Sequence, residues 1–237
     1  MNPQNTLHQA RAGDLAGYDE GLRRHMLGIY RYMMLGLVVS GATAALVANT
    51  PALYQAIFGT PLKWVAMLAP LAFVMLLGFR IERMSAGAAL GAFFAFAAVM
   101  GISLASVFVV FTGASVASAF LSAAVLFATL SLWGYTTNRD LSRWSTFLMV
   151  GLLVVVGASL VNLLIGSSAL QMAISAIGIL IFTGLTAWDT QRLKSEYLAY
   201  AGTEATEKLA VMGALSLYLN FVNLFQLLLT FMGQREE

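Results

Sequence analysis

The sequence contains no cysteine and is poor in charged residues. Of its 237 residues, 10% are charged and 59% are hydrophobic, whereas a soluble domain carries roughly 25% charged residues. Without cysteine, disulfide frameworks, cysteine-based zinc sites and thiol catalysis are excluded. The formal net charge of +2 provides no clustered basic surface, so we expect no nucleic-acid partner. The composition excludes an ordinary cytosolic enzyme and predicts an integral membrane protein, whose first partner is the lipid bilayer.

The charged residues stand in short windows that separate five long uncharged runs. A helix that crosses a bilayer needs about 20 residues, so the runs over 84–138 and 144–188 must each turn back once. Small polar residues at 112–115 and 166–168 allow these turns. The sequence therefore predicts an all-α membrane domain over residues 32–237, preceded by a polar tail over 1–31. Its seven transmembrane helices are predicted at about 32–50, 64–79, 86–108, 114–136, 144–164, 169–188 and 209–231.

Lysine and arginine alternate between the two predicted sides of the membrane. Eleven of the 13 lie in the tail and in the second, fourth and sixth loops, whereas Lys63 and Arg235 lie on the other side. The eleven are Arg11, Arg23, Arg24, Arg31, Arg80, Arg83, Arg139, Arg143, Arg192, Lys194 and Lys208. Basic residues favour the cytoplasmic side. This distribution predicts a cytoplasmic N-terminus and a periplasmic C-terminus.

Motifs for catalysis and metal binding are missing from the sequence. It contains no H-E-x-x-H, G-x-S-x-G, Walker or G-x-G-x-x-G motif. The two histidines, His8 and His25, lie in the tail, where we expect them to be solvated. We therefore expect neither an enzyme nor a resident cofactor. Gly87 and Gly91 form a G-x-x-x-G pattern at the start of the third span, which we expect to serve tight packing within the bundle.

Polar residues follow one face of the last predicted span. Their steps of three and four residues confine them to about 120° of the helix, and they are Ser216, Asn220, Asn223, Gln226 and Thr230. Amides are costly against lipid, so this stripe should face the interior and make the last helix central. Asp189, at the end of the sixth span, has two readings. It is a functional intramembrane carboxylate, or it is a solvated interfacial residue near Arg192 and Lys194.

Three segments carry a resemblance to a known family. They are GYTTNRDLS at 134–142, GLTAWDTQRLK at 184–194 and GALSLYLNFVNLFQLLLTF at 213–231. The chain resembles the bacterial, YccA-like branch of the Bax inhibitor-1, or transmembrane BAX inhibitor motif, family. The resemblance implies a multi-pass protein of the bacterial inner membrane in which six helices wrap the seventh. It also implies that some members are pH-sensitive calcium leaks, whereas others regulate partners in membrane proteolysis or stress.

In the leaking members, the resemblance implies two aspartates on helices six and seven and a latch arginine near the end of helix two. The first aspartate falls on Asp189, and the second falls on Asn220, which is a departure. The latch falls on Arg83, preferred over Arg80. Two close carboxylates share a proton, whereas a carboxylate beside an amide does not, so the departure calls pH gating by that device into question. Calcium prefers several carboxylates, which leaves Asp189 as a lone candidate ligand and calcium as cargo.

The resemblance requires Asp189 and Asn220 to be neighbours, but hydropathy places them at different depths. Asn220 lies eleven residues, about 16 Å, inside the last predicted span, whereas Asp189 lies at the edge of the sixth. We therefore expect helix six to continue to about Lys194, helix seven to begin before Leu209, or both.

Two functions follow from the sequence. The first is a cation leak, with calcium as the suggested ion, whose path runs past Asp189, Asn220, Asn223 and Gln226. The second is a non-transporting membrane regulator of a protease or stress-response partner, acting through its tail and loops. No oligomeric state is predicted.

Overall fold

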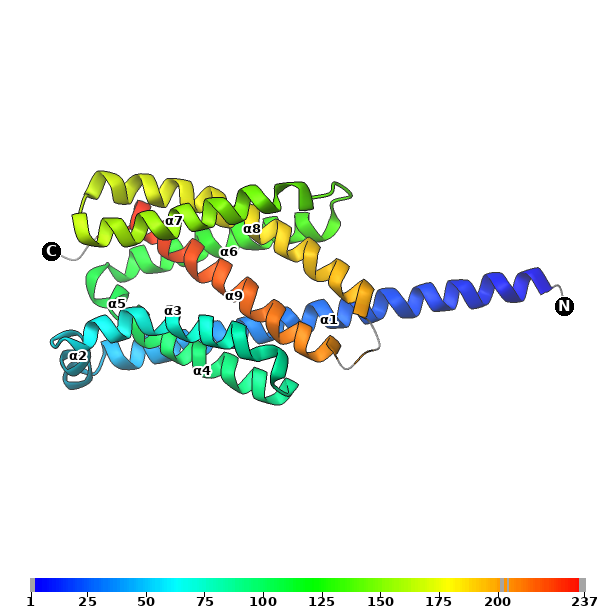
Figure 1. Cartoon of the computed structure of the whole chain (residues 1–237), viewed down its shortest axis with the longest axis horizontal. Helices are drawn as coiled ribbons and strands as arrows, with labels where there is room; N and C mark the ends of the chain where they lie inside the picture. The colour runs from blue at the N-terminus through cyan, green and yellow to red at the C-terminus, as the bar shows by residue number, and fades with distance from the viewer. Residues whose placement is uncertain (1–2, 201–202, 204, 235–237) are drawn as a thin grey trace.

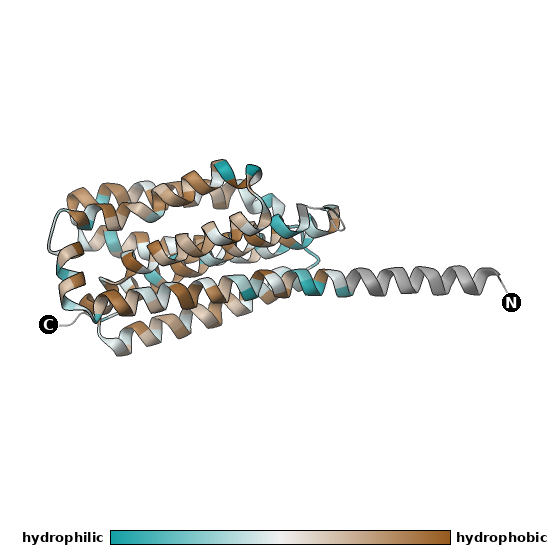
Figure 2. Cartoon of the chain, turned by 90° about the horizontal axis from the view of Figure 1, so that it is seen from below, coloured by the Kyte–Doolittle hydropathy of each residue, from teal (hydrophilic) through white to brown (hydrophobic). Residues whose placement is uncertain are grey.

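The chain is an all-α bundle with seven helices long and apolar enough to cross a membrane. The computed structural model describes residues 3–200, 203 and 205–234, with side chains over 20–81, 83–200, 203 and 206–234. The helices are α1 (Pro3–Ala48), α2 (Pro51–Phe58), α3 (Leu62–Arg80), α4 (Ala86–Leu104), α5 (Val107–Val110), α6 (Gly113–Thr136), α7 (Ser145–Ile165), α8 (Ser168–Tyr200) and α9 (Ala205–Met232). In Figure 2, brown apolar residues predominate along the coloured parts of these helices.

The seven predicted spans are confirmed, with two differences in length. Residues 3–31 of the predicted tail and the first span belong to one helix, α1, and the division between tail and membrane domain stays a prediction. The side chains before Glu20 lie outside those described. The sixth span, predicted to end at 188, continues as α8 to Tyr200, and α9 begins at Ala205. Both extensions expected from the depth of Asp189 and Asn220 are therefore present.

Both predicted turns within the long apolar runs occur where small polar residues stand. α7 ends at Gly166, whose φ of 71° is in the left-handed region that glycine adopts without strain. At the other turn, the Thr112 hydroxyl accepts a hydrogen bond from the Ser115 N–H and caps α6. The short helix α5 leads into this cap (Figure 1).

The last helix is central, as the polar stripe predicts, but the six others do not all wrap it. Figure 1 shows α9 crossing the middle of the bundle, where it packs against α8, α1, α6 and α4. α3 packs mainly on α4, and α7 mainly on α8, so both form an outer layer. In the described chain, α3 and α7 make no extensive contact with each other, and neither do α1 and α6. We call these two gaps the α3/α7 seam and the α1/α6 seam.

A buried tyrosine joins three of the helices at the centre. The Tyr218 side chain on α9 is fully buried, and its hydroxyl lies 2.6 Å from Ser40 Oγ on α1. Ser40 Oγ in turn lies 2.7 Å from the carbonyl oxygen of Ala97 on α4. The rings of Phe93 and Phe96 meet the tyrosine ring edge to face at 5.7 and 5.8 Å. The polar end of Tyr218 is thus satisfied inside the bundle, which fixes the position of α9.

The expected role of the G-x-x-x-G pattern is wrong. A Cβ added at Gly87 or Gly91 would meet nothing within 4 Å, so neither glycine allows a close helix contact in the described structure. The close approach occurs instead at Gly134 on α6, where an added Cβ would collide with the backbone carbonyl of Ala187 on α8. The contact of α6 with α8 therefore depends on Gly134, a glycine outside the pattern. Its neighbour Ala187 precedes Asp189 by two residues on α8.

Candidate functional site

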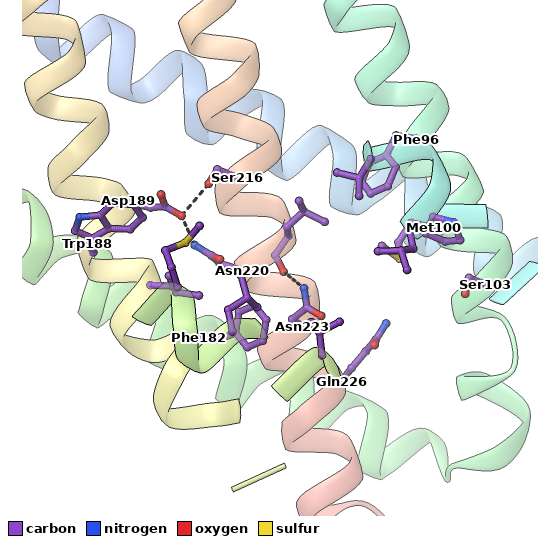
Figure 3. Close-up of a pocket in the computed structure, with 18 of the residues that line it drawn as sticks. Phe96, Met100, Ser103, Phe182, Trp188, Asp189, Ser216, Asn220, Asn223 and Gln226 are labelled. Carbon is purple, nitrogen blue, oxygen red and sulfur yellow. Dashed lines mark hydrogen bonds between the residues drawn. The ribbon is translucent and has the colours of Figure 1, made fainter. Parts of the chain in front are cut away.

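Asp189 is buried in the bundle and contacts the residue that the resemblance places opposite it. Its exposed fraction is 4%, because α8 continues for three turns beyond it. Asn220 Nδ2 on α9 donates a hydrogen bond to Asp189 Oδ2 at 2.7 Å. The Ser216 hydroxyl, one turn earlier on α9, donates to the same oxygen at 2.8 Å (Figure 3). Amide and hydroxyl donors both favour the charged carboxylate.

The other oxygen of Asp189 is paired with Arg192. Arg192 Nη2 lies 2.6 Å and Nε 3.1 Å from Asp189 Oδ1, in a forked arrangement within one turn of α8. Arg192 also donates to Glu196 at 3.2 Å, and its guanidinium carbon lies 5.2 Å from the Trp188 ring centroid. Asp189 is therefore neither solvated nor unpaired: it is a buried member of an ion pair. Sequence reasoning did not select Arg192, although the spacing of three residues places it on the same helix face.

The polar stripe of α9 faces a cavity of about 500 Å³ behind the α3/α7 seam. Asp189, Asn220, Asn223 and Gln226 all line it, so the structure brings together the four predicted path residues. Asn223 donates to the carbonyl oxygen of Leu219. The Gln226 amide points into the space in Figure 3 and has no bonded partner in the described part of the protein. Side chains of α3, α4 and α7 close the remaining walls.

This cavity holds one carboxylate and an arginine that neutralises it. Among the described residues, no three histidine, aspartate or glutamate side chains gather as a metal site, and calcium prefers six to eight oxygen ligands. The amide oxygens and hydroxyls along α9 can solvate a passing cation, and Asp189 can attract it. The geometry suits a path with one weak binding position better than a tight site.

Neither latch candidate contacts Asp189. Arg80 and Arg83 stand at the end of α3 and in the following 3-10 turn, and both are exposed. The arginine bonded to Asp189 is Arg192, so a latch role for Arg80 or Arg83 stays a prediction. His25 also differs from expectation, because it is half-buried with its ring centroid 4.8 Å from that of Tyr197. His8 lies outside the residues whose side chains are described.

The segment GYTTNRDLS at 134–142 ends in a loop that α8 holds through one glutamine. Gln191 Oε1 accepts the Leu141 N–H at 2.9 Å, and its Nε2 donates to the carbonyl oxygen of Arg139 at 2.8 Å. Within the loop, the Ser142 N–H donates to Asp140, which lowers the pKa of that carboxyl.

A second polar cavity, of about 480 Å³, lies between this loop and α8. Trp188 and Arg192 line it as well as the first cavity. They therefore stand between the polar stripe and the end of the bundle that carries the basic loops, called here the basic end.

The fold and the buried Asp–Arg–Asn cluster define a seven-helix integral membrane protein with a polar interior. Comparison with known proteins gives its family. A family model described as "Inhibitor of apoptosis-promoting Bax1" matches residues 22–237. The inner membrane protein YbhL of Escherichia coli K12 is 40% identical over 218 residues, covering 91% of this chain and 93% of YbhL. RP147 of Rickettsia prowazekii is 40% identical over 93% of both chains. The chain belongs to the Bax inhibitor-1 family.

Proposed function

We propose that this protein is a slow cation leak of the bacterial inner membrane that Arg192 holds closed. The observation that carries the proposal is the cavity behind the α3/α7 seam, where the polar stripe of α9 leads to a single buried carboxylate, Asp189. A cation entering from the end opposite the basic loops meets Gln226 and Asn223 before it reaches Asp189. Calcium is the proposed ion, by the resemblance to leaking members of the family.

Arg192 closes this path in two ways. Its guanidinium occupies Asp189 Oδ1, which a cation would otherwise bind. Its charge also repels a cation, by about 4 kcal/mol per unit of cation charge at 4 Å for an effective dielectric constant of 20. The bond of Arg192 to Glu196, one turn nearer the basic end, provides a second position toward which the arginine can move. Opening then requires Arg192 to leave Asp189 while remaining paired with Glu196.

Arg192→Gln is expected to raise calcium entry into proteoliposomes at least about tenfold, the change that about 1.4 kcal/mol produces. The physical reason is that the repulsive charge leaves the path while the carboxylate stays. The measurement is uptake by vesicles loaded with a calcium-sensitive dye. Arg143→Gln is the matched control, because Arg143 is an exposed arginine at the basic end that does not line the cavity, and its flux should equal that of the natural protein.

The double variant Asp189→Asn/Arg192→Gln tests whether the carboxylate attracts the ion. It should lose most of the flux that the single variant gains. Equal flux in Arg192→Gln and the natural protein, with both correctly folded, would contradict the leak. If calcium entry were as fast in the double variant as in Arg192→Gln, Asp189 would not be part of the path.

A second candidate function is the non-transporting regulator. The observation that favours it is the completeness of the Asp189 cluster, in which hydrogen bonds from Arg192, Ser216 and Asn220 occupy both carboxylate oxygens. Such a cluster also suits a fixed structural core. If calcium entry is absent from pH 5 to 8 for the natural protein and for Arg192→Gln, the regulator becomes the better account.

The orientation is also a proposal: the basic end faces the cytoplasm, as the charge count predicts. A periplasm-active reporter such as alkaline phosphatase, fused after Glu237, should be active. The same reporter inserted at Gly202 should be inactive, because seven spans place these positions on opposite sides. The reverse pattern would show that the basic end faces the periplasm. Equal activity at both positions would overturn the seven-span topology.

A further inference from the structure

The α1/α6 seam contains a groove that the proposed leak does not use. Its cavity volume is about 810 Å³, and its floor is formed by Phe221 of α9. Met26, Met33 and Met34 line the α1 side, and Ala124 and Ala128 line the α6 side. The methionines are flexible and adapt to an irregular apolar ligand, whereas the alanines leave space. The groove lies on the outer surface of the bundle, within the membrane-spanning part of both helices.

Below its mouth, the groove presents no polar group in need of a partner. Tyr30 and Ser131 line it, and their hydroxyl oxygens lie 2.5 Å apart. Ser131 Oγ is also 2.9 Å from Thr190 Oγ1, and Thr190 donates to the carbonyl oxygen of Thr186. Because the Thr190 hydroxyl already donates its hydrogen to Thr186, Ser131 must donate to Thr190, and Tyr30 must donate to Ser131. These hydroxyls are satisfied within the protein, so the groove suits a hydrocarbon ligand.

The mouth of the groove is positively charged. Arg23 lines it with a side chain that is 70% exposed, and its acidic partner, Glu20, is shared with Arg24. Lys194 on α8 does not line the groove, but its ammonium group lies 5.1 Å from the ring centroid of Tyr135, which does, and it donates to the Tyr135 carbonyl oxygen. Both cations stand at the basic end. Arginine binds phosphate groups with its planar fork of donors, and a nearby lysine adds positive charge.

The length of the groove matches one leaflet of the bilayer. From Ala124 to Tyr135 its α6 wall covers twelve residues, whose first and last Cα atoms are about 16 Å apart along the helix. The hydrocarbon core of a bilayer is about 30 Å thick, so the groove reaches its middle and ends there. A transmembrane helix from a partner or from a second copy would cross both leaflets and would need a longer groove. One lipid tail, with its headgroup at the basic end, fits this length.

We propose that the α1/α6 groove binds one anionic phospholipid from the leaflet at the basic end. The phosphate lies at Arg23, with the positive charge of Lys194 beside Tyr135, and an acyl chain follows the methionines of α1 toward Phe221. The hydroxyl chain from Tyr30 through Ser131 ends at Thr190, next to Asp189 in α8. Occupation of the groove therefore holds α1, α6 and α8 in the arrangement that buries Asp189. The proposal does not depend on ion flux, because lipid binding is measured directly.

The test compares phosphatidylglycerol with phosphatidylcholine of the same acyl chains, each added to delipidated protein. Native mass spectrometry counts bound lipids, and thermal unfolding in detergent reports stabilisation. Phosphatidylglycerol is expected to bind one copy at least about tenfold more tightly and to raise the melting temperature by several degrees. Equal binding of the two lipids would overturn the proposal, because the groove would then hold ordinary annular lipid.

Two pairs of variants locate the site. Arg23→Gln should abolish the preference for phosphatidylglycerol, whereas Arg143→Gln, an exposed arginine away from the groove, should retain it. Ala128→Phe should fill the groove and remove the bound lipid, whereas Val125→Phe, exposed on the same helix but outside the groove, should not.

Secondary structure by circular dichroism confirms that each variant folds. If both Arg23→Gln and Ala128→Phe kept the preference for phosphatidylglycerol, the assignment of the lipid site to the α1/α6 groove would be wrong. If Ala128→Phe instead converted a dimer into a monomer in light scattering, the groove would be an interface with a second copy.

Discussion

Asn220→Asp is expected to create a pH-dependent calcium flux that the natural sequence lacks. Asn220 Nδ2 lies 2.7 Å from Asp189 Oδ2, so the new carboxylate would replace a hydrogen-bond donor by a like charge in direct contact. Two carboxylates at this distance cannot both ionise at low cost, and the pair takes up a proton as the pH falls. The variant cavity then alternates between one and two negative charges as the pair exchanges this proton, and only the doubly charged form competes for a cation against Arg192. We expect flux to rise at least about fivefold between pH 5 and pH 8, measured in dye-loaded proteoliposomes.

Stability should change in the opposite direction to flux in this variant. At neutral pH the folded pair keeps a proton that the unfolded chain has lost, so the free energy of unfolding falls as the pH rises. The melting temperature of Asn220→Asp should therefore be lower at pH 8 than at pH 5.

Asn223→Asp is the matched control for both measurements. It adds the same charge to the same cavity, one turn further along α9, where the natural amide bonds Leu219 and not Asp189. Matching pH profiles in the two variants would show that the contact with Asp189 has no special role. A flat profile in Asn220→Asp would remove the paired carboxylates as a switch in this protein.

Gly134→Ala is expected to destabilise the bundle by about 1 to 3 kcal/mol, the usual cost of overpacking. The added methyl group would collide with the carbonyl oxygen, carbonyl carbon and Cα of Ala187. These are backbone atoms, so no side-chain rotation relieves the contact, and α6 and α8 must move apart. The measurement is thermal unfolding in detergent, where the melting temperature should fall by several degrees.

Gly91→Ala is the control for this substitution. Gly91 is also a helical glycine, but a Cβ there meets nothing within 4 Å. Alanine is favoured over glycine inside a helix by roughly 0.5 to 1 kcal/mol, so this variant should be as stable as the natural protein or more so. Equal melting temperatures for the two variants would show that the Gly134 contact is not tight. A dimer lost in Gly91→Ala would instead assign the exposed glycines to self-association.

The sequence predicts the spans well because uncharged runs and their polar breaks are local features. The ends of α8 and α9 were harder to predict for a physical reason. Asp189 ends the uncharged run and Arg192 and Lys194 follow it, yet both cations are satisfied against the bundle, by Asp189 and by the Tyr135 carbonyl oxygen. The helix therefore continues past them. A charge that finds its partner on its own helix or on a neighbour does not mark a membrane boundary.

The contact of Asp189 with Asn220 was predictable from the sequence, but the pairing of Asp189 with Arg192 was not. The stripe on α9 and the resemblance selected Asp189 and Asn220, and the structure places them in contact. The choice of Arg192 over Arg80 or Arg83 depends on how far α3 stands from α8, which helix periodicity does not determine. The two seams were unpredictable for the same reason, because an apolar helix face fits lipid and protein equally well.

The two hydrogen bonds of Gln191 connect α8 to the loop at the basic end. Gln191 follows Asp189 by two residues, so its side chain points to the other side of the same turn, where it holds the backbone of the loop at Arg139 and Leu141. A rotation of α8 large enough to separate Asp189 from Asn220 on α9 must pull on this loop or release it. A movement of α8 at Asp189 and a movement of the loop at the basic end are thereby coupled. If the protein is the proposed leak, a ligand that binds this loop is expected to alter cation flux, because the same helix positions the loop and Asp189.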